Sequence, residues 1–196
     1  MLKFHSMIKK YLKPSIAIVC TFATLLTIQS CNKLASALQY NFAMNTGSVT
    51  VVIPAISDTG TQLTLGTASN TYNVDSVIKA NSASTLGISN ITSIKLTSCV
   101  VTITSGYSTA NNFANFESCN ASFSSTSNTT PYVISIPSNP DINATSISIP
   151  VDSTAELKSY ISGTTFNYSL GGKLRRATTA PITCTVQFTF AVNVQG

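Results

Sequence analysis

The feature that most constrains the fold of this chain is the alternation of side chains over residues 182–194. Seven apolar residues occupy every second position from Ile182 to Val194, and Thr, Gln, Asn and one Ala lie between them. A β-strand directs successive side chains to opposite faces, so this period predicts one buried face and one solvated face. A helix would spread the same residues around its circumference. We therefore expect a strand whose apolar face is covered by a second layer.

Short apolar segments bounded by Gly, Pro, Asn and Ser recur through the rest of the chain. Such spacing is typical of a two-layer antiparallel sandwich, and a barrel is the alternative. The predicted strands are 38–44, 48–54, 61–65, 71–74, 90–105, 116–124, 132–136, 144–151, 166–170, 173–176 and 182–194. The sequence therefore predicts an all-β, two-layer antiparallel β-sandwich with two short helices.

Capping patterns mark the two predicted helices. Asp75 and Ser76 can each accept a hydrogen bond from a free amide, which predicts a helix over 77–81. Ser153 and Glu156 form the spacing of a capping box, which predicts a second helix over 157–161.

Two strands are expected to be irregular. The apolar phase of the 90–105 strand changes between Leu96 and Cys99, which predicts a bulge near Thr97 and Ser98. The pair Gly171-Gly172 predicts a bend between two strand segments.

Residues 1–30 are organised like a secretory leader. Basic residues at 9–13 precede an apolar stretch over 15–28. At about 1.5 Å per helical residue, this stretch is shorter than the roughly 30 Å hydrocarbon core of a bilayer. The arrangement favours a signal peptide over a transmembrane helix.

The end of this leader, Ile28-Gln29-Ser30-Cys31, resembles a relaxed bacterial lipobox. Gln29 departs from the stricter form, a variation that lipoproteins of the Bacteroidota tolerate. The resemblance implies a lipoprotein signal peptide over 1–30, a membrane anchor through lipid on Cys31, a short tether over 31–37 and a single β-sandwich domain over 38–196. A secreted, non-lipidated β-sandwich is the alternative.

The whole chain resembles small lipoproteins of unassigned function in the Bacteroidota, through this leader and segments such as 112–116 and 173–179. The resemblance implies an outer-membrane lipoprotein of the cell envelope. Surface-exported lipoproteins of the Bacteroidota usually carry an acidic cluster just after the lipidated cysteine. Residues 32–35 contain no acid, so the resemblance implies a domain that faces the periplasm. The family supplies no activity to transfer to this chain.

The charge of the chain lies mainly in the leader. Four of its 11 basic residues fall within the first 13 positions, and the rest nearly balance the six acids. A nearly neutral mature protein lacks the basic surface that nucleic acids require, so no nucleic-acid partner is expected.

The residues that commonly carry catalysis are scarce. The single histidine, His5, lies in the leader, which leaves no Ser-His-Asp or Cys-His arrangement in the mature chain. Most acids fall at helix starts or turns, and Glu117 is the one acid within a predicted strand. We expect no enzyme activity, no cofactor and no metal site.

Two groups of residues are candidates for binding. Lys173, Arg175 and Arg176 can contact an anionic group or a partner protein, or they can protect an edge strand by charge. Tyr107 and Phe113, which flank the 106–112 loop, are the candidates for glycan contact. Two functions follow as hypotheses: protein–protein interaction in an outer-membrane assembly, and carbohydrate binding.

The mature chain also contains three cysteines besides Cys31. Exported proteins meet an oxidising compartment, where neighbouring thiols pair. Cys99 and Cys119 are symmetric about Thr109, so a hairpin would bring their Cβ atoms to about 4.5–5.5 Å. The spacing predicts a Cys99–Cys119 disulfide with Cys184 as a buried free thiol, and the alternative is a bond from Cys184 across the two layers.

Replacing Cys31 with Ala tests the proposed anchor. Labelled palmitate should enter the wild-type protein, and the variant should lose both the label and its membrane association because the lipid is attached to that thiol. Fractionation and autoradiography measure this, and equal labelling of the two proteins would contradict lipidation at Cys31.

Overall fold

The computed structural model describes residues 38–196. Among these residues, contacts separate Leu38, Gln39, Gln195 and Gly196 from a compact unit of Tyr40–Val194. In the first group, the amide of Gly196 donates to the carbonyl of Leu38 at 3.0 Å. The predicted signal peptide, the tether and Cys31 lie outside the described residues.

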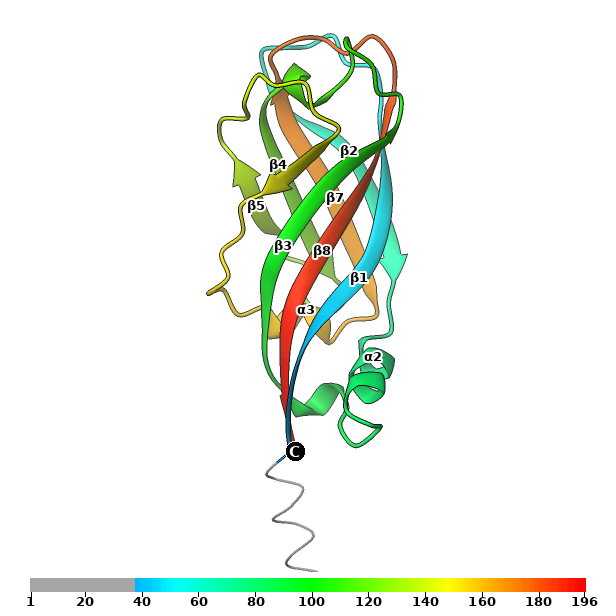
Figure 1. Ribbon diagram of the computed structural model, residues 1–196, viewed down its shortest axis with the longest axis vertical. Coiled ribbons are helices and arrows are strands. Elements are labelled where there is room, and N and C mark those ends of the chain that lie inside the picture. Colours follow the sequence, from blue (N-terminus) through cyan, green and yellow to red (C-terminus); the bar gives the residue numbers. More distant parts are fainter. Residues whose placement is uncertain (1–37) are drawn as a thin grey trace, which may run out of the picture. The chain divides into compact units, whose positions relative to one another are not determined.

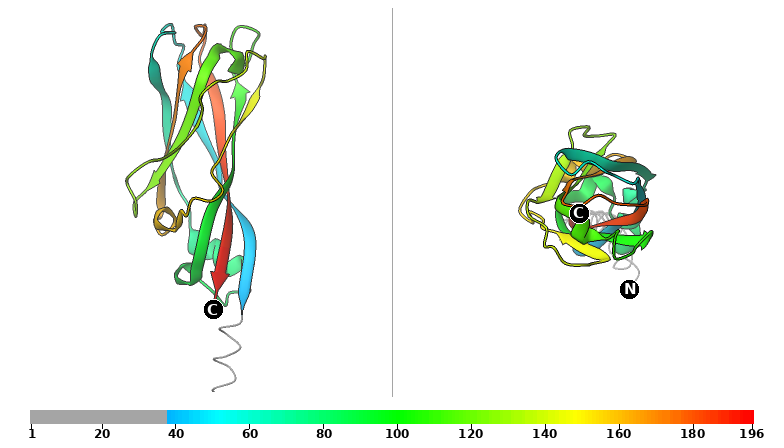
Figure 2. Two further views of the ribbon diagram at one scale, coloured as in Figure 1. Left: turned by 90° about the vertical axis from the view of Figure 1, so that its left-hand side faces the viewer. Right: turned by 90° about the horizontal axis from the view of Figure 1, so that it is seen from above.

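Eight strands form two four-stranded sheets that face each other (Figures 1 and 2). The strands are β1 (Gln39–Ile53), β2 (Gln62–Thr71), β3 (Ile91–Ser105), β4 (Phe116–Ser125), β5 (Tyr132–Ile136), β6 (Ser146–Ile149), β7 (Thr165–Leu174) and β8 (Ile182–Gln195). Two α-helices, α2 (Val74–Asn81) and α3 (Lys158–Ile161), and the 3-10 turns η1 (Ile88–Asn90) and η2 (Phe113–Asn115) complete the fold. The predicted all-β, two-layer antiparallel sandwich with two short helices is confirmed.

The strand order is that of a jelly roll. One sheet has the order β1-β8-β3-β6 and the other β2-β7-β4-β5, so every connection except the β4–β5 hairpin crosses between the sheets. This is the arrangement of an eight-stranded double-sheet jelly roll. The connections 54–61, 106–115, 137–145 and 175–181 lie together at the upper end in Figure 1, and we call them the distal loops.

Strand β8 supplies the centre of the core. Its inward residues are all buried: Ile182, Cys184, Val186, Phe188, Phe190, Val192 and Val194. Phe123 of the opposite sheet lies with its ring centroid 5.3 Å from that of Phe188 and 5.6 Å from that of Phe190. Tyr168 stacks on Phe188 at 5.6 Å. The alternation over 182–194 is therefore the inner face of a central strand, as predicted.

Strand β3 contains three bulges against β8, and each is closed by a threonine. The register shifts fall at Thr92, Thr97 and Thr104, so the bulge predicted near Thr97 is confirmed. Each threonine hydroxyl donates to a β8 carbonyl, at 3.1, 3.0 and 3.2 Å respectively. These bonds satisfy carbonyls beside a disrupted ladder, where a bulge increases local twist.

Helix α2 begins earlier than its predicted cap. Its N-cap is Asn73, whose side chain accepts from the amide of Ser76 at 3.0 Å. Asp75 lies inside the helix, where it pairs with Lys79 at 2.6 Å and accepts from the amide of Ile88 at 2.9 Å. The carboxylate thus fastens the 3-10 turn η1 to the helix.

The predicted capping box of Ser153 and Glu156 does not form. Helix α3 starts at Lys158 and its N-cap residue, Leu157, makes no side-chain cap. Glu156 accepts from the amide of Lys158 at 3.0 Å and also from the amide of Ile94 and the hydroxyl of Ser93, both at 2.8 Å. At Ile94, beyond the residues of β3 that pair with β6, the carboxylate of Glu156 accepts the backbone hydrogen bond that a neighbouring strand would otherwise accept.

The structure has a continuous strand at two places where the sequence predicted an interruption. The segments 38–44 and 48–54 belong to the single strand β1, whose inward phase changes at Gly47, where φ is +81°. β7 runs through the predicted bend at 171–172. Opposite that pair, β2 shifts register at Leu65, and a Cβ on Gly66 would lie 2.5 Å from the Val51 side chain. The glycines permit close approach of strands instead of bending one.

The predicted Cys99–Cys119 disulfide is wrong because β3 and β4 do not form a hairpin. The two strands lie in different sheets, where Cys99 is opposite Phe188 and Cys119 is opposite Gly172. All three described cysteines are free and buried, and Cys184 is a buried free thiol as predicted. Burial raises the pKa of Cys99 and Cys119 to about 12 and the pKa of Cys184 to about 11, so these thiols are weakly reactive.

Phe188→Ala should lower the free energy of unfolding by about 3–5 kcal/mol, because it leaves a cavity between Phe123 and Tyr168. Gln187 is exposed on the outer face, so Gln187→Thr should change it by less than about 0.5 kcal/mol. Denaturant unfolding measures both values, and similar losses in the two variants would contradict the assigned faces.

Candidate functional site

Buried polar side chains concentrate in the distal loops. Eight polar residues are buried in the described part of the chain, and five of them belong to these loops. They are Asn111, Asn112, Asn115, Asn139 and Thr178. Loop backbone removed from water requires hydrogen-bond partners, and asparagine supplies both a donor and an acceptor.

Asn115 joins two of the loops. Its side-chain amide donates to the carbonyls of Ala110 and Ala177 at 2.9 and 3.0 Å, and its side-chain oxygen accepts from the amide of Asn112 at 3.1 Å. Its own carbonyl accepts from the amide of Arg175 at 2.7 Å. The β3–β4 and β7–β8 loops are therefore held together from within.

Thr178 and Asn111 extend this network. The amide of Thr178 donates to the carbonyl of Ile56, and the amide of Ile56 donates to the Thr178 hydroxyl, both at 2.9 Å. The side chain of Asn111 accepts from the amide of Thr179 at 2.7 Å and donates to its hydroxyl at 3.0 Å. The β1–β2 loop is thereby tied to the β7–β8 loop.

Asn139 connects the fourth distal loop, 137–145, to the other three. Its side-chain amide donates to the carbonyls of Phe113 and Phe116 at 2.8 and 3.1 Å, and its own amide donates to the carbonyl of Glu117 at 2.7 Å. All four distal loops thus belong to one hydrogen-bonded network, which we call the asparagine network.

The basic cluster predicted as an anion contact is paired within the chain. Lys173 lies 3.0 Å from Glu117, and Arg176 donates from two nitrogens to the carboxylate of Asp141 at 2.5 and 2.9 Å. The hydrogen bond from Arg176 and the positive charges of Arg176 and Arg175 lower the pKa of Asp141. The cluster therefore carries little unpaired charge with which to attract an external anion.

The arginines of this cluster also bind loop carbonyls. Arg175 donates to the carbonyls of Ala114 and Asn139 at 2.9 and 2.8 Å, and Arg176 donates to that of Ala114 at 3.0 Å. The alternative, charge protection of an edge strand, is wrong for Lys173, because β7 lies between β2 and β4. The arginines instead join the end of β7 to the β3–β4 and β5–β6 loops.

The two aromatic residues predicted to contact a glycan are separated by the fold. Phe113 belongs to η2, which turns its ring into the core at 3% exposure, so it forms no surface platform. Tyr107 is 48% exposed, and its hydroxyl donates to the side chain of Asn143 at 2.9 Å. Only one of the predicted pair can meet a ligand at the surface.

A surface hollow of about 210 Å³ is lined in part by Ile142 and Ala144, the chain neighbours of the Asn143 to which Tyr107 donates. Its lining is mainly apolar and comes from Phe113, Asn139, Pro140, Ile142, Ala144, Ser146 and Ile147. Ile142 is 66% exposed. We call this feature the distal hollow. Ile142 was not predicted as a site residue, although an isolated isoleucine between Asp141 and Asn143 in a polar loop is the signal that could have indicated it.

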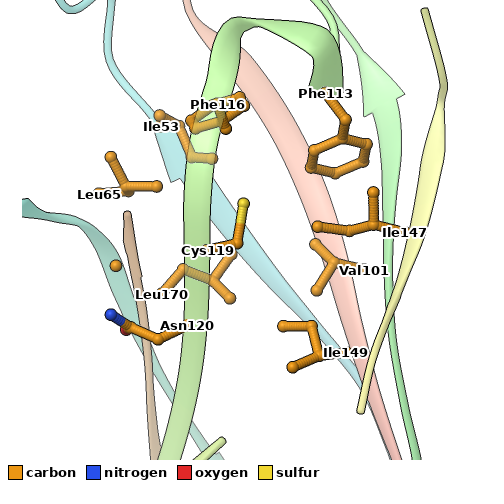
Figure 3. A pocket seen from close by; sticks show the side chains of 11 residues that line it. Ile53, Leu65, Val101, Phe113, Phe116, Cys119, Asn120, Ile147, Ile149 and Leu170 are labelled. Atoms are coloured by element: carbon orange, nitrogen blue, oxygen red, sulfur yellow. The ribbon is translucent and has the colours of Figure 1, made fainter. Parts of the chain in front are cut away.

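A second cavity lies inside the sandwich, below the distal loops (Figure 3). It is lined by apolar side chains of both sheets, among them Leu65, Val101, Cys119 and Ile149. Its volume of about 10 Å³ is close to the minimum that one water molecule needs. This cavity is a packing gap and has no room for a ligand.

The described residues contain no group of three or more His, Cys, Asp or Glu side chains that could hold a metal ion. No helix within residues 38–196 is long and apolar enough to span a bilayer.

No protein-family model and no curated protein matches this sequence. Solved structures with a similar trace include infectious bursal disease virus Gt strain, at 11% identity and a TM-score of 0.37, which covers 82% of this chain and 34% of that one. Desmodium yellow mottle tymovirus has 11% identity, a TM-score of 0.31 and coverage of 81% and 87%. A Macrobrachium rosenbergii nodavirus particle has 10% identity, a TM-score of 0.33 and coverage of 82% and 97%. This chain spans about a third of the bursal disease virus chain.

Asn115→Ala should lower the free energy of unfolding by about 1–3 kcal/mol, because it leaves the buried amide of Asn112 without a partner and removes the hydrogen bonds to the carbonyls of Ala110 and Ala177. Amide exchange should accelerate in the 106–115 and 175–181 loops. Asn143→Ala is the matched control, since it removes one exposed hydrogen bond, and equal effects of the two substitutions would contradict the role of the asparagine network.

Proposed function

We propose that this chain is a lipid-anchored cell-envelope binding module that contacts another protein through the distal loops. The observation that carries the proposal is the asparagine network, which holds the four distal loops together, two of which line an apolar hollow. Binding to mobile loops loses affinity to the entropy of ordering them, whereas a preformed surface avoids much of that cost. Binding residues are often found on loops held by a rigid scaffold.

The size and chemistry of the distal hollow favour a polypeptide partner. Its volume of about 210 Å³ suits one or two side chains, and small-molecule pockets usually measure roughly 300–1,000 Å³. Ile142 supplies exposed apolar surface in its lining, and the exposed ring of Tyr107 is bonded through its hydroxyl to Asn143, the next residue of the chain. Such side chains are typical anchors of protein interfaces.

Carbohydrate binding has less support from the site. Phe113 is buried, which leaves Tyr107 as the single exposed aromatic side chain of the predicted pair. The hydroxyl of Tyr107 is already bonded to Asn143. A sugar would therefore find one aromatic face and few free polar groups beside it.

The position of the loops also fits an anchor on Cys31. Strand β1 begins at Gln39, directly after the tether and Leu38 in the sequence, and ends at Ile53, where the distal loop 54–61 begins. A seven-residue tether reaches at most about 25 Å when extended. In the proposed outer-membrane lipoprotein the length of β1 separates the first distal loop from the tether, and the distal loops face the periplasm.

A photo-crosslinking residue in place of Ile142 tests this function in intact cells. One dominant envelope protein should be captured, and its purified form should bind the full chain with at least tenfold lower affinity after Ile142→Asp. Val52→Asp is the matched control, since Val52 is a similarly exposed aliphatic residue, at 58%, outside the hollow. Equal binding by the two variants would contradict the proposal, and binding of a glycan on an array would favour the carbohydrate alternative.

A further inference from the structure

Strand β5 is an edge strand with regular geometry. It pairs with β4 alone, from Phe123 opposite Tyr132 to Cys119 opposite Ile136, without a register shift. An antiparallel edge strand directs alternate N–H and C=O groups away from its sheet. Within residues 38–196, the recorded backbone hydrogen bonds of β5 are those of its ladder with β4.

The other long edges are modified in ways that hinder pairing. On β1, the inward phase breaks at Gly47, and the carbonyl of Thr46 already accepts from the side chain of Asn70 at 3.2 Å. On β2, the register shifts between Thr64 and Gly66. Natural sheets protect their edges with such bulges, with charge or with very short strands, as in four-residue β6.

The sequence of β5 carries neither a bulge nor a charge along its five residues. Tyr-Val-Ile-Ser-Ile has no charge and consists mainly of residues that favour strands. Val133 is 58% exposed on the outer face. Pro131 and Pro137 flank the strand and limit any pairing to the segment between them, because proline cannot donate to a ladder.

The β5 edge leads directly to the distal hollow. The strand runs towards the distal loops, and the chain that follows Ile136 and Pro137 supplies Asn139, Pro140 and Ile142 to the lining. A strand rises about 3.3 Å per residue, so Val133 and Ile136 are roughly 10 Å apart along it. An extended segment of about six residues could pair with β5 and place its next side chain at the hollow.

We infer that β5 binds an extended, uncharged segment of a partner protein, which adds to the sheet as a fifth strand and inserts one apolar side chain into the distal hollow. The inference rests on the proposed function and specifies its mode of contact. Main-chain hydrogen bonds provide the affinity of such strand addition, and pockets for side chains provide its specificity.

A second copy of the chain fits this surface less well. Antiparallel pairing of two β5 strands about Ile134 would set Ile136 of one copy opposite Tyr132 of the other. The end of each strand that adjoins the hollow would then meet the end of the other copy that bears Pro131. No paired strand residue of the second copy would enter the hollow, whereas a separate extended segment continues into it.

Random 12-residue peptides displayed on phage and selected on the full chain provide the probe. Selected peptides should be uncharged and rich in Val, Ile, Thr and Tyr, with an apolar residue beyond the pairing segment. Val133→Lys should lower the affinity of the chain for a synthetic selected peptide at least tenfold. Thr67→Lys, on the opposite edge of the same sheet, is the control and should leave that affinity within twofold. Ser135→Lys repeats the test if Val133→Lys lowers the melting temperature.

Backbone N-methylation of the peptide separates strand pairing from side-chain contact. Methylation of one set of alternate amides should abolish binding, and methylation of the other set should leave it within threefold, because only one edge of the peptide meets β5. Equal tolerance of both sets, no selected peptide, or unchanged affinity of Val133→Lys would overturn the inference. A dimer of the full chain that Val133→Lys dissociates would assign the edge to a second copy and would also overturn it.

The distal-loop function and strand addition to β5 can be contradicted independently of each other. If Val133→Lys abolishes peptide binding while the crosslink from position 142 to the partner persists, the distal-loop function stands and strand addition is wrong. If peptides bind β5 but Ile142→Asp leaves the partner bound, the edge is a binding site and the distal-loop function is wrong.

Discussion

The structure depends on the contact between the inner face of β8 and the aromatic side chains of the opposite sheet. Phe188 and Phe190 meet Phe123 with ring centroids 5.3 and 5.6 Å apart, and Tyr168 stacks on Phe188. In a chain with only 9% charged residues, this apolar layer is the main source of folding free energy. Aromatic pairs in tilted or edge-on geometry add to the gain from burial. The two sheets are therefore joined most firmly at their centre, and their ends require other interactions.

Hydrogen bonds hold the distal end of the sandwich together, whereas apolar contacts hold its centre. Jelly-roll connections cross between sheets, which brings the loops over the end of the core and buries part of their polar groups. Four asparagines and Thr178 satisfy that backbone, and Arg175 donates to two further carbonyls. A buried network is favourable only when its groups have partners, because an unsatisfied polar group in the interior is costly. This requirement makes the loops rigid, and rigidity is what lets them present Ile142 and Tyr107 in a fixed arrangement.

The fold class and the faces of the strands followed from the sequence because period two is a local property. Ile182 to Val194 and the bulge at Thr97 were predictable in this way. The pairing of strands was not, since a jelly roll sends β3 and β4 to different sheets, and the expected Cys99–Cys119 pair assumed that consecutive strands adjoin. Short polar motifs also misled: Glu156 forms no capping box with Ser153, because its carboxylate accepts from the amide of Ile94 in a distant strand as well as from the amide of Lys158. Phe113 was assigned to the surface because nothing in its neighbours reveals the turn η2.

The edge strands of the two sheets differ in how far they are protected from pairing with another chain. The edge strands β1 and β2 carry irregularities at Gly47 and Gly66, and Glu156 accepts from the backbone amide of Ile94 in β3. A chain that blunts these edges and leaves uncharged β5 regular retains an avoidable risk of aggregation, since an exposed apolar edge is a template for pairing. Flanking prolines limit that risk without removing the edge. A strand edge that is kept open, is limited to five residues and leads to an apolar hollow has the features expected of a surface that receives one extended segment.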